Sequence, residues 1–268
     1  MVPQFSFSVF PFVVLFAVAS AEVHELTHFT YSGEQGPDHW GSLSPSSSAC
    51  SSGKSQSPVN IKKDEIVKSK DWKPLIRNYE RANATLINNG FNVAVHYESD
   101  AGVLILDGKN YTLNGIHWHI PSEHQIDGVL YDAELHLVHQ ATSDKSLSVV
   151  SILFEYGDSD PFVAKLEGEL DKLAKETCGE DEQAHIPLGT VDNRLLRKHT
   201  RNYYRYVGSL TTPPCTENVV WNILGKVRKI SKEQVAALTA PLADVNKKNA
   251  RPVQELNGRK VELYSELD

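Results

Sequence analysis

The amino-acid sequence predicts a predominantly β fold of the α+β class, in which one large, twisted, mostly antiparallel sheet carries a few peripheral helices. Strand-like alternation of apolar and polar residues recurs along the chain, turn signals separate these segments, and only two stretches have a helical pattern. The 268 residues, 40% of them hydrophobic, suffice for a substantial core. The formal net charge of −7 is spread out and includes no basic stripe, so we expect no nucleic acid partner.

Residues 1–21 differ from the rest of the chain and predict a secretory signal peptide. An apolar run over 5–18 is followed by Ala19, Ser20 and Ala21, a small-residue cleavage signature before Glu22. The run is short for a membrane span, which argues against an uncleaved anchor. We therefore expect one mature domain over 22–268, with no membrane span, that acts as a monomer.

An oxidising compartment agrees with two other features of the sequence. Asn83 and Asn110 begin N-glycosylation sequons, which we place in turns or at strand edges. The cysteines Cys50, Cys178 and Cys215 allow one disulfide and one free thiol, and their spacing leaves the pairing open. The expectation is a secreted glycoprotein of the extracellular space (the apoplast), with delivery to a plastid through the secretory pathway as an open alternative.

Most elements that follow are short strands. A Gly-, Pro- and Ser-rich run over 31–57 predicts extended surface structure in which Trp40 needs a place to pack. A hairpin turn is expected at 107–110. The expected strands cover residues 57–61, 85–90, 91–97, 103–106, 111–113 and 148–155, the last in the centre of the sheet.

The two helical patterns lie in the second half of the chain. Asp160 and Pro161 are a cap-and-proline start, and apolar residues at helical spacing continue to about Lys175. Ser231 has the character of an N-cap that leads into a helix over 235–238.

The stretch most informative about chemistry is 115–124, in which His117 and His119 stand two residues apart in a β-prone segment. Alternate residues of a strand share a face, so both imidazoles point the same way. A second alternating segment over 133–139 contributes His136. A lone His-x-His pair is usually an ordinary polar strand face, but three imidazoles from two neighbouring strands would form a catalytic zinc tripod that leaves a fourth position for water.

A proline-containing loop over 203–217 is the last informative segment. Pro213 and Pro214 exclude a helix or a central strand there. The loop is then either rigid surface structure or a support for groups held over a site. Trp221 follows in an apolar strand, where the default role of a tryptophan is core.

Together these segments resemble the α-class carbonic anhydrases, specifically their secreted plant branch, from about Tyr31 to Val261. The motifs that carry the resemblance are Gly36-Pro37-x-x-Trp40, Gln56-Ser57-Pro58-Val59-Asn60-Ile61, His117-Trp118-His119-x-Pro121-Ser122-Glu123-His124, Glu134-Leu135-His136-x-Val138-His139 and Gly208-Ser209-Leu210-Thr211-Thr212-Pro213-Pro214-Cys215. The resemblance implies that family's fold and the reversible hydration of carbon dioxide to bicarbonate and a proton, by attack of zinc-bound hydroxide.

The resemblance also implies individual roles. Zinc would be held by His117, His119 and His136. The hydroxyl of Thr211 would accept from the zinc-bound hydroxide and donate to an ionised, buried Glu123. The other implied groups are Glu134, His124 and Tyr206 around the third ligand, Asn249 beside His119, a carbon dioxide pocket of Val138, Val149, Leu210, Val219, Trp221 and Thr212, and a disulfide between Cys50 and Cys215 that leaves Cys178 over. We place Glu134 on the strand face opposite to His136.

Two departures from the family pattern stand out. Phe91 follows the Asn-Asn-Gly turn where efficient members have a histidine that carries protons to solvent. Without that group, proton release to water limits turnover to about 10³ s⁻¹ unless buffer assists. His28 and the Tyr31 hydroxyl are weak substitutes. Gly115 stands where most relatives have a glutamine that accepts from the first zinc ligand, so we expect weakened zinc retention.

Two further functions remain in competition with carbon dioxide hydration. Some plant relatives are abundant tuber proteins with altered sites, so a catalytically weak storage or binding protein on the same scaffold is the alternative from another class. A zinc esterase would use the same site and would differ only by assay. The presence of all three histidines together with Thr211 and Glu123 favours the carbonic anhydrase.

Overall fold

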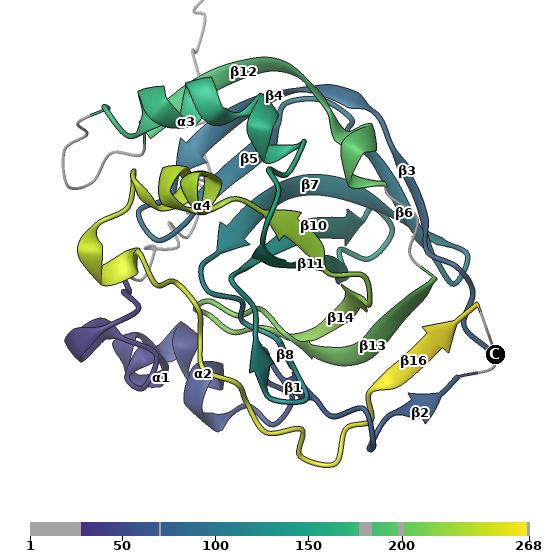
Figure 1. Ribbon diagram of the computed structural model, residues 1–268. Helices are drawn as coiled ribbons and strands as arrows, with labels where there is room; N and C mark the ends of the chain where they lie inside the picture. Colours follow the sequence, from purple (N-terminus) through teal and green to yellow (C-terminus); the bar gives the residue numbers. More distant parts are fainter. Residues whose placement is uncertain (1–27, 70, 177–183, 198–200, 267–268) are drawn as a thin grey trace, which may run out of the picture.

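The computed structural model describes residues 28–69, 71–176, 184–197 and 201–266 (Figure 1). Its main feature is a twisted sheet of 13 strands, whose order along the principal path is β12-β4-β5-β7-β10-β11-β14-β13-β16-β2. Most neighbours are antiparallel, while β11 runs parallel to β14 and β15. This confirms the predicted fold class. The predicted signal peptide and Cys178 lie outside the described residues.

The strands of the large sheet are β2 (Val67–Lys68), β3 (Ile76–Tyr79), β4 (Arg81–Asn88), β5 (Val93–Tyr97), β6 (Gly102–Leu106), β7 (Lys109–His119), β10 (Ala133–Ala141), β11 (Leu147–Tyr156), β12 (Ala184–Asp192), β13 (Asn202–Ser209), β14 (Glu217–Leu224), β15 (Arg228–Ile230) and β16 (Glu262–Ser265). A small second sheet consists of β1 (Asn60–Ile61), β8 (Gln125–Ile126) and β9 (Val129–Leu130). The α-helices are α1 (Trp40–Leu43), α2 (Ala49–Ser52), α3 (Glu167–Leu173) and α4 (Lys232–Thr239), and the 3-10 turns are η1 (Gly33–Gln35), η2 (Pro45–Ser47), η3 (Val163–Lys165), η4 (Asn193–Leu196) and η5 (Asp244–Asn246).

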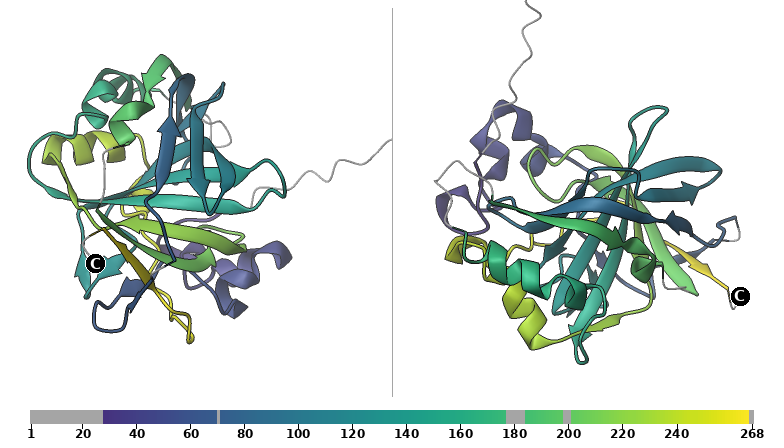
Figure 2. Two further views of the ribbon diagram at one scale, coloured as in Figure 1. Left: turned by 90° about the vertical axis from the view of Figure 1, so that its right-hand side faces the viewer. Right: turned by 90° about the horizontal axis from the view of Figure 1, so that it is seen from above.

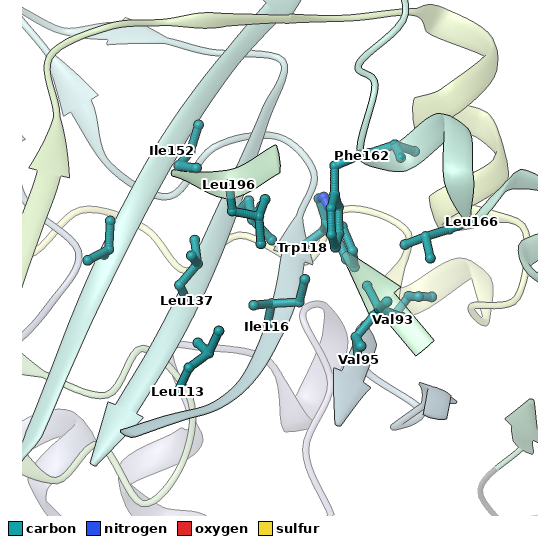
Figure 3. Close-up of a cluster of buried hydrophobic side chains, with 14 of the residues drawn as sticks. Val93, Val95, Leu113, Ile116, Trp118, Leu137, Ile152, Phe162, Leu166 and Leu196 are labelled. Atoms are coloured by element: carbon teal, nitrogen blue, oxygen red, sulfur yellow. The ribbon is translucent and has the colours of Figure 1, made fainter. Parts of the chain in front are cut away.

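The central strands present a different chemistry on each face. In β7, Ile116 and Trp118 are almost fully buried in the larger hydrophobic core, while the residues between them face the other way. Phe162 stacks on Trp118 with ring centroids 6.3 Å apart, and Leu166 packs beside it (Figure 3). Helices α3 and α4 lie on this side of the sheet, and α1 and α2 lie on the other (Figure 2). The sheet therefore separates an apolar core from a more polar face.

Several predicted elements are confirmed. Asp107 and Gly108 both have positive φ in the tight turn between β6 and β7, as a two-residue hairpin requires. Strand β11 lies between β10 and β14 and is central. Ser231 caps α4 in a complete capping box with Gln234. Among the described residues, no helix has the length and apolar character needed to cross a membrane.

The extended structure predicted for 31–57 is wrong in part, because α1, α2, η1 and η2 lie there. Serine side chains satisfy local backbone carbonyls: Ser42 donates to the His39 carbonyl, and Ser52 to the Ser48 carbonyl. These local bonds favour single helical turns over extended chain. Trp40 is fully buried against Phe29, as predicted for a residue that needs a packing site.

Two other expectations need correction. The helix predicted from 160 to about 175 is a 3-10 turn, η3, followed by the short α3; Asp160 nevertheless caps the start, because its carboxylate accepts from the Phe162 and Val163 amides. Asn83 lies in the middle of β4, between β12 and β5, and not at an edge or turn. Asn83 is nevertheless exposed, and Asn110 is exposed directly after the 107–108 turn.

Candidate metal centre

Three histidines converge where β7 and β10 pair antiparallel. His117 lies directly opposite His136, and His119 lies one step along on the same face of β7. The ring centroids of His117, His119 and His136 are 4.6 to 5.1 Å apart. His117 Nε2 and His136 Nδ1 are separated by 3.3 Å. Two nitrogen ligands at ~2.0–2.1 Å from a tetrahedral zinc would lie about 3.3–3.4 Å apart, so this spacing fits a shared cation.

In His119 and His136, the ring nitrogen that faces away from the other histidines has a hydrogen-bond partner. The second nitrogen of each ring is left for the site. The backbone carbonyl of Asn249 lies 2.6 Å from His119 Nδ1, and Glu134 Oε1 lies 2.8 Å from His136 Nε2. His119 Nε2 is consequently buried with no hydrogen-bond partner among the described residues. An orphaned buried nitrogen is costly in a protein interior unless a ligand or ion occupies its lone pair. These atoms therefore fit a metal ion better than they fit an empty core.

The three imidazoles are held in the form that binds metals. Burial lowers the pKa of His119 to about 4, against a smaller opposing effect of the Asn249 carbonyl. Burial also lowers the pKa of His117 and of His136. All three rings are neutral at physiological pH, and a neutral imidazole has the lone pair that a cation requires.

Glu134 anchors the ligand His136 to the fold. Its Oε1 also lies 2.7 Å from His124 Nδ1 and accepts from the Ser151 hydroxyl at 2.6 Å. His124 Nε2 in turn lies 2.6 Å from the Tyr206 hydroxyl. Burial by itself would raise the pKa of Glu134, but His124 and His136 hold that pKa well below its usual range, so the carboxylate is ionised. Such a partner fixes the tautomer and the orientation of a ligand ring.

The placement of Glu134 on the face opposite to His136 was wrong. Residues 134 and 136 are two apart in β10, so the regular alternation of a strand puts their side chains on one face. Their 2.8 Å contact follows directly from that alternation.

Glu123 is a second buried carboxylate near the three histidines. It is 1% exposed, and its Oε1 accepts from the Arg251 amide at 3.0 Å. Oε2 has no well-formed hydrogen bond among the described residues, although the Thr211 hydroxyl is among the groups that lower the pKa of this carboxyl. Burial outweighs those groups and raises the pKa of Glu123 to about 7. A nearby cation would favour the ionised form.

The residues expected to form the carbon dioxide pocket lie together beside the histidines. Val149, Val219 and Trp221 belong to one buried hydrophobic cluster against which Val138 and Leu210 pack. The Trp221 ring lies 4.8 Å from the His136 ring. Thr212 is half-buried in the adjoining loop, where its carbonyl accepts from the Cys215 amide. The result is an apolar wall next to the three imidazoles.

The disulfide between Cys50 and Cys215 is present and connects the α2 segment to the loop after Thr211. The residue that sequence reasoning missed is Arg251, which is 3% exposed. Its guanidinium donates to Gln56 Oε1 and to the Ser57 and Cys50 carbonyls, at 2.8 to 2.9 Å. No motif signalled it, because its partners lie about 200 residues earlier in the chain.

None of Phe91, Tyr31 and His28 provides an evident proton carrier for the site. The Phe91 ring packs on Phe29, with centroids 4.6 Å apart. Burial raises the pKa of Tyr31 well above its usual value, so this phenol does not exchange protons near neutrality. His28 is exposed and bonded to Gln35.

Gly115 leaves His117 without a side-chain acceptor. No described group accepts a hydrogen bond from His117 Nδ1, whereas His119 and His136 each have an outer partner. A Cβ atom built on Gly115 would lie 3.1 Å from the Val95 carbonyl oxygen and 3.7 Å from His96 Cδ2. A side chain at position 115 would therefore require the Val95 backbone in β5 to shift by a few tenths of an ångström.

Gly115→Gln is expected to slow zinc loss to a chelator, by up to about tenfold, because the added amide oxygen accepts from His117 Nδ1. The measurement is the rate of zinc release into a chromogenic chelator. Gly115→Ala is the matched control, since it adds the same Cβ without an acceptor. Equal release rates for wild type and Gly115→Gln would contradict the expected role of an outer acceptor.

Comparisons with known proteins agree with this geometry. The family model described as eukaryotic-type carbonic anhydrase matches residues 35–265. Alpha carbonic anhydrase 7 of Arabidopsis thaliana is 39% identical over 262 residues, which cover 96% of this chain and 93% of that protein. A crystal structure of dioscorin complexed with ascorbate has a TM-score of 0.85 at 36% identity, over 89% of this chain and 98% of that one. The α-carbonic anhydrase of Thermovibrio ammonificans, in complex with the inhibitor sulfanilamide, has a TM-score of 0.78 at 34% identity, over 88% and 99%.

Proposed function

This chain belongs to the eukaryotic-type carbonic anhydrase family, and from that premise we propose that it interconverts carbon dioxide and bicarbonate with a zinc ion held by His117, His119 and His136. The observation that carries the proposal is the convergence of three neutral imidazoles, one of which has a buried and unpartnered Nε2. Zinc bound there would lower the pKa of a water molecule toward neutrality and so supply a nucleophile at physiological pH.

The protein's own groups would orient the reaction. Ionised Glu123 would accept a hydrogen bond from the Thr211 hydroxyl, so that the Thr211 oxygen is left as an acceptor toward the nucleophile. The apolar wall around Val149 and Trp221 holds carbon dioxide, which is small and has no net dipole. Glu134 keeps the His136 ring fixed throughout.

Zinc stoichiometry and stopped-flow carbon dioxide hydration on the same preparation test this function. We expect one zinc per chain and hydration that is abolished by a chelator and restored by zinc. Protein that retains no stoichiometric zinc after refolding with excess metal would refute the proposal. It would favour a binding protein on the same scaffold, a second function that the likeness to the ascorbate-bound dioscorin structure supports. An ester hydrolysis assay would show whether the site also acts as an esterase.

Phe91→His is expected to raise turnover in dilute buffer by about tenfold, because it adds a titratable ring where the wild type has an apolar one. The phenyl ring is half-buried against Phe29, so a histidine of smaller volume fits there. Phe91→Ala is the control that removes the ring without adding a proton carrier. Identical turnover of the two variants across buffer concentrations would show that proton release is not limiting.

We also propose entry into the secretory pathway and glycosylation at Asn83 and Asn110. Both asparagines are exposed, and the Cys50–Cys215 disulfide suits an oxidising compartment. Peptide mapping of protein from its native source, before and after removal of N-glycans, tests both sequons and the cleavage before Glu22.

A further inference from the structure

The site face of the sheet contains a fourth histidine that no motif singled out. In β5, Val95 pairs with Ile116 of β7, and both are buried in the larger core. Their neighbours Ala94 and His96 therefore point to the opposite face, the one that carries the zinc ligands. His96 lies directly across from Gly115 and diagonally from His117.

Gly115 places no side chain between His96 and His117. A Cβ atom on residue 115 would lie 3.7 Å from His96 Cδ2, in van der Waals contact, so any larger side chain would extend over this imidazole. Diagonal neighbours on one sheet face are about 7–8 Å apart, a span that one or two water molecules bridge. The charge of His96 is felt at the ligand, because it is among the groups that lower the pKa of His117.

His96 also reaches solvent. It is exposed, whereas His119, His136 and His139 are buried. Thr85 of β4 lies on its other side, with its hydroxyl donating to Glu98, and the exposed His185 of β12 lies beyond. Polar and titratable groups thus continue from the ligand side of the sheet to its outer rim.

We propose that His96 carries the proton released in carbon dioxide hydration from the zinc site to solvent, along a path that the absence of a side chain at Gly115 leaves open. This inference rests on the proposed function and deepens it. His96 acts from strand β5, and Phe91 makes only an apolar contact. The histidine absent at position 91 and the glutamine absent at position 115 are then two parts of one change in the proton path.

The charges around His96 set how well it performs this role. Partial burial lowers the pKa of His96, and the neighbouring His185 lowers it further. Glu98, which directly follows β5, and Thr85 opposite are the other polar groups near His96, and His117 faces it from β7. A carrier with a lowered pKa accepts protons less readily, so added buffer still speeds turnover.

The test compares His96→Ala and His96→Gln with wild type in dilute and in concentrated buffer, at equal zinc content. We expect kcat in dilute buffer to fall by about tenfold or more in both variants, and to recover when imidazole buffer is added. The ratio kcat/KM should change little, because it reports the interconversion of carbon dioxide and bicarbonate, which precedes proton release. His39→Ala, which removes another exposed imidazole, is the matched control.

A second readout does not depend on activity. In NMR spectra of the zinc-loaded and zinc-free protein, the ring signals of His96, assigned by their loss in His96→Gln, should shift with pH, with a midpoint below that of a free histidine, because partial burial and His185 lower the pKa of this ring. Ring signals that do not shift with pH would overturn the proposal, as would an unchanged kcat in dilute buffer or an equal fall of kcat and kcat/KM. Zinc-loaded wild type that does not hydrate carbon dioxide would instead refute the proposed function, and the role of His96 with it.

Discussion

Replacement of His119 by alanine should abolish zinc retention and carbon dioxide hydration together. His119 Nε2 is a buried nitrogen with no hydrogen-bond partner among the described residues, and the ring is fully enclosed. Its removal leaves two ligands of the three that a catalytic zinc requires. Without zinc, nothing would lower the pKa of the attacking water toward neutrality, so we expect turnover to fall by at least ~10⁴-fold.

Metal analysis and stopped-flow hydration of the same sample measure this loss. His139→Ala is the matched control. His139 belongs to β10 and, like His119, is fully buried, but it bonds the Tyr79 hydroxyl on the other side of the sheet. This control should lose stability while it retains one zinc per chain. A full complement of zinc in His119→Ala would mean that other groups hold the metal, and the proposed site would be wrong.

Loss of the Cys50–Cys215 disulfide is expected to have the largest effect on stability. The bond joins positions 165 residues apart. Chain entropy alone then predicts a loss of about 5 kcal/mol in the free energy of unfolding, within the ~2–5 kcal/mol found when native disulfides are removed. Chemical denaturation of the Cys50→Ser, Cys215→Ser double variant measures this difference directly.

Cys178→Ser is the control for the disulfide variant, because Cys178 is the cysteine that the disulfide leaves over. Its unfolding curve should match that of wild type. The double variant should also lose activity before it unfolds, since the Cys215 carbonyl and the loop after Thr211 are held to Gln56 beside the bond. A double variant with wild-type stability would show that the disulfide gives no net stabilisation, against the chain-entropy expectation.

The placement of His117 and His119 on one strand face could be predicted from sequence because it depends only on alternation, whereas the pairing that puts His136 opposite His117 comes from the structure. Residues 117, 119 and 136 occupy site-face positions, and the buried Ile116 and Trp118 occupy the core face. The hydrogen-bond partners of these histidines were harder to predict from the sequence. Asn249 uses its backbone carbonyl toward His119, and its side chain instead accepts from the Ile120 amide, a distinction that no residue type encodes.

The sequence does not show which strands pair with each other or in which register. His96 stands in a readable alternating segment, but its place opposite Gly115 follows only from the pairing of β5 with β7. The short helices α1 and α2 were missed because four-residue turns have too few residues for a helical period. Arg251 was missed because its contacts join segments from the two ends of the chain.

Strand β7 has a consequence for how this protein can change over time. Its positions 117 and 119 carry imidazoles that face the candidate metal site, while positions 116 and 118 supply aliphatic and indole mass to the interior. Insertion or deletion of one residue there would exchange the two sets. Trp118 would then be exposed, and the imidazoles would be buried in the hydrophobic core. Selection for a folded chain therefore opposes such shifts in β7 and, as a by-product, keeps His117 and His119 on the same face of the sheet.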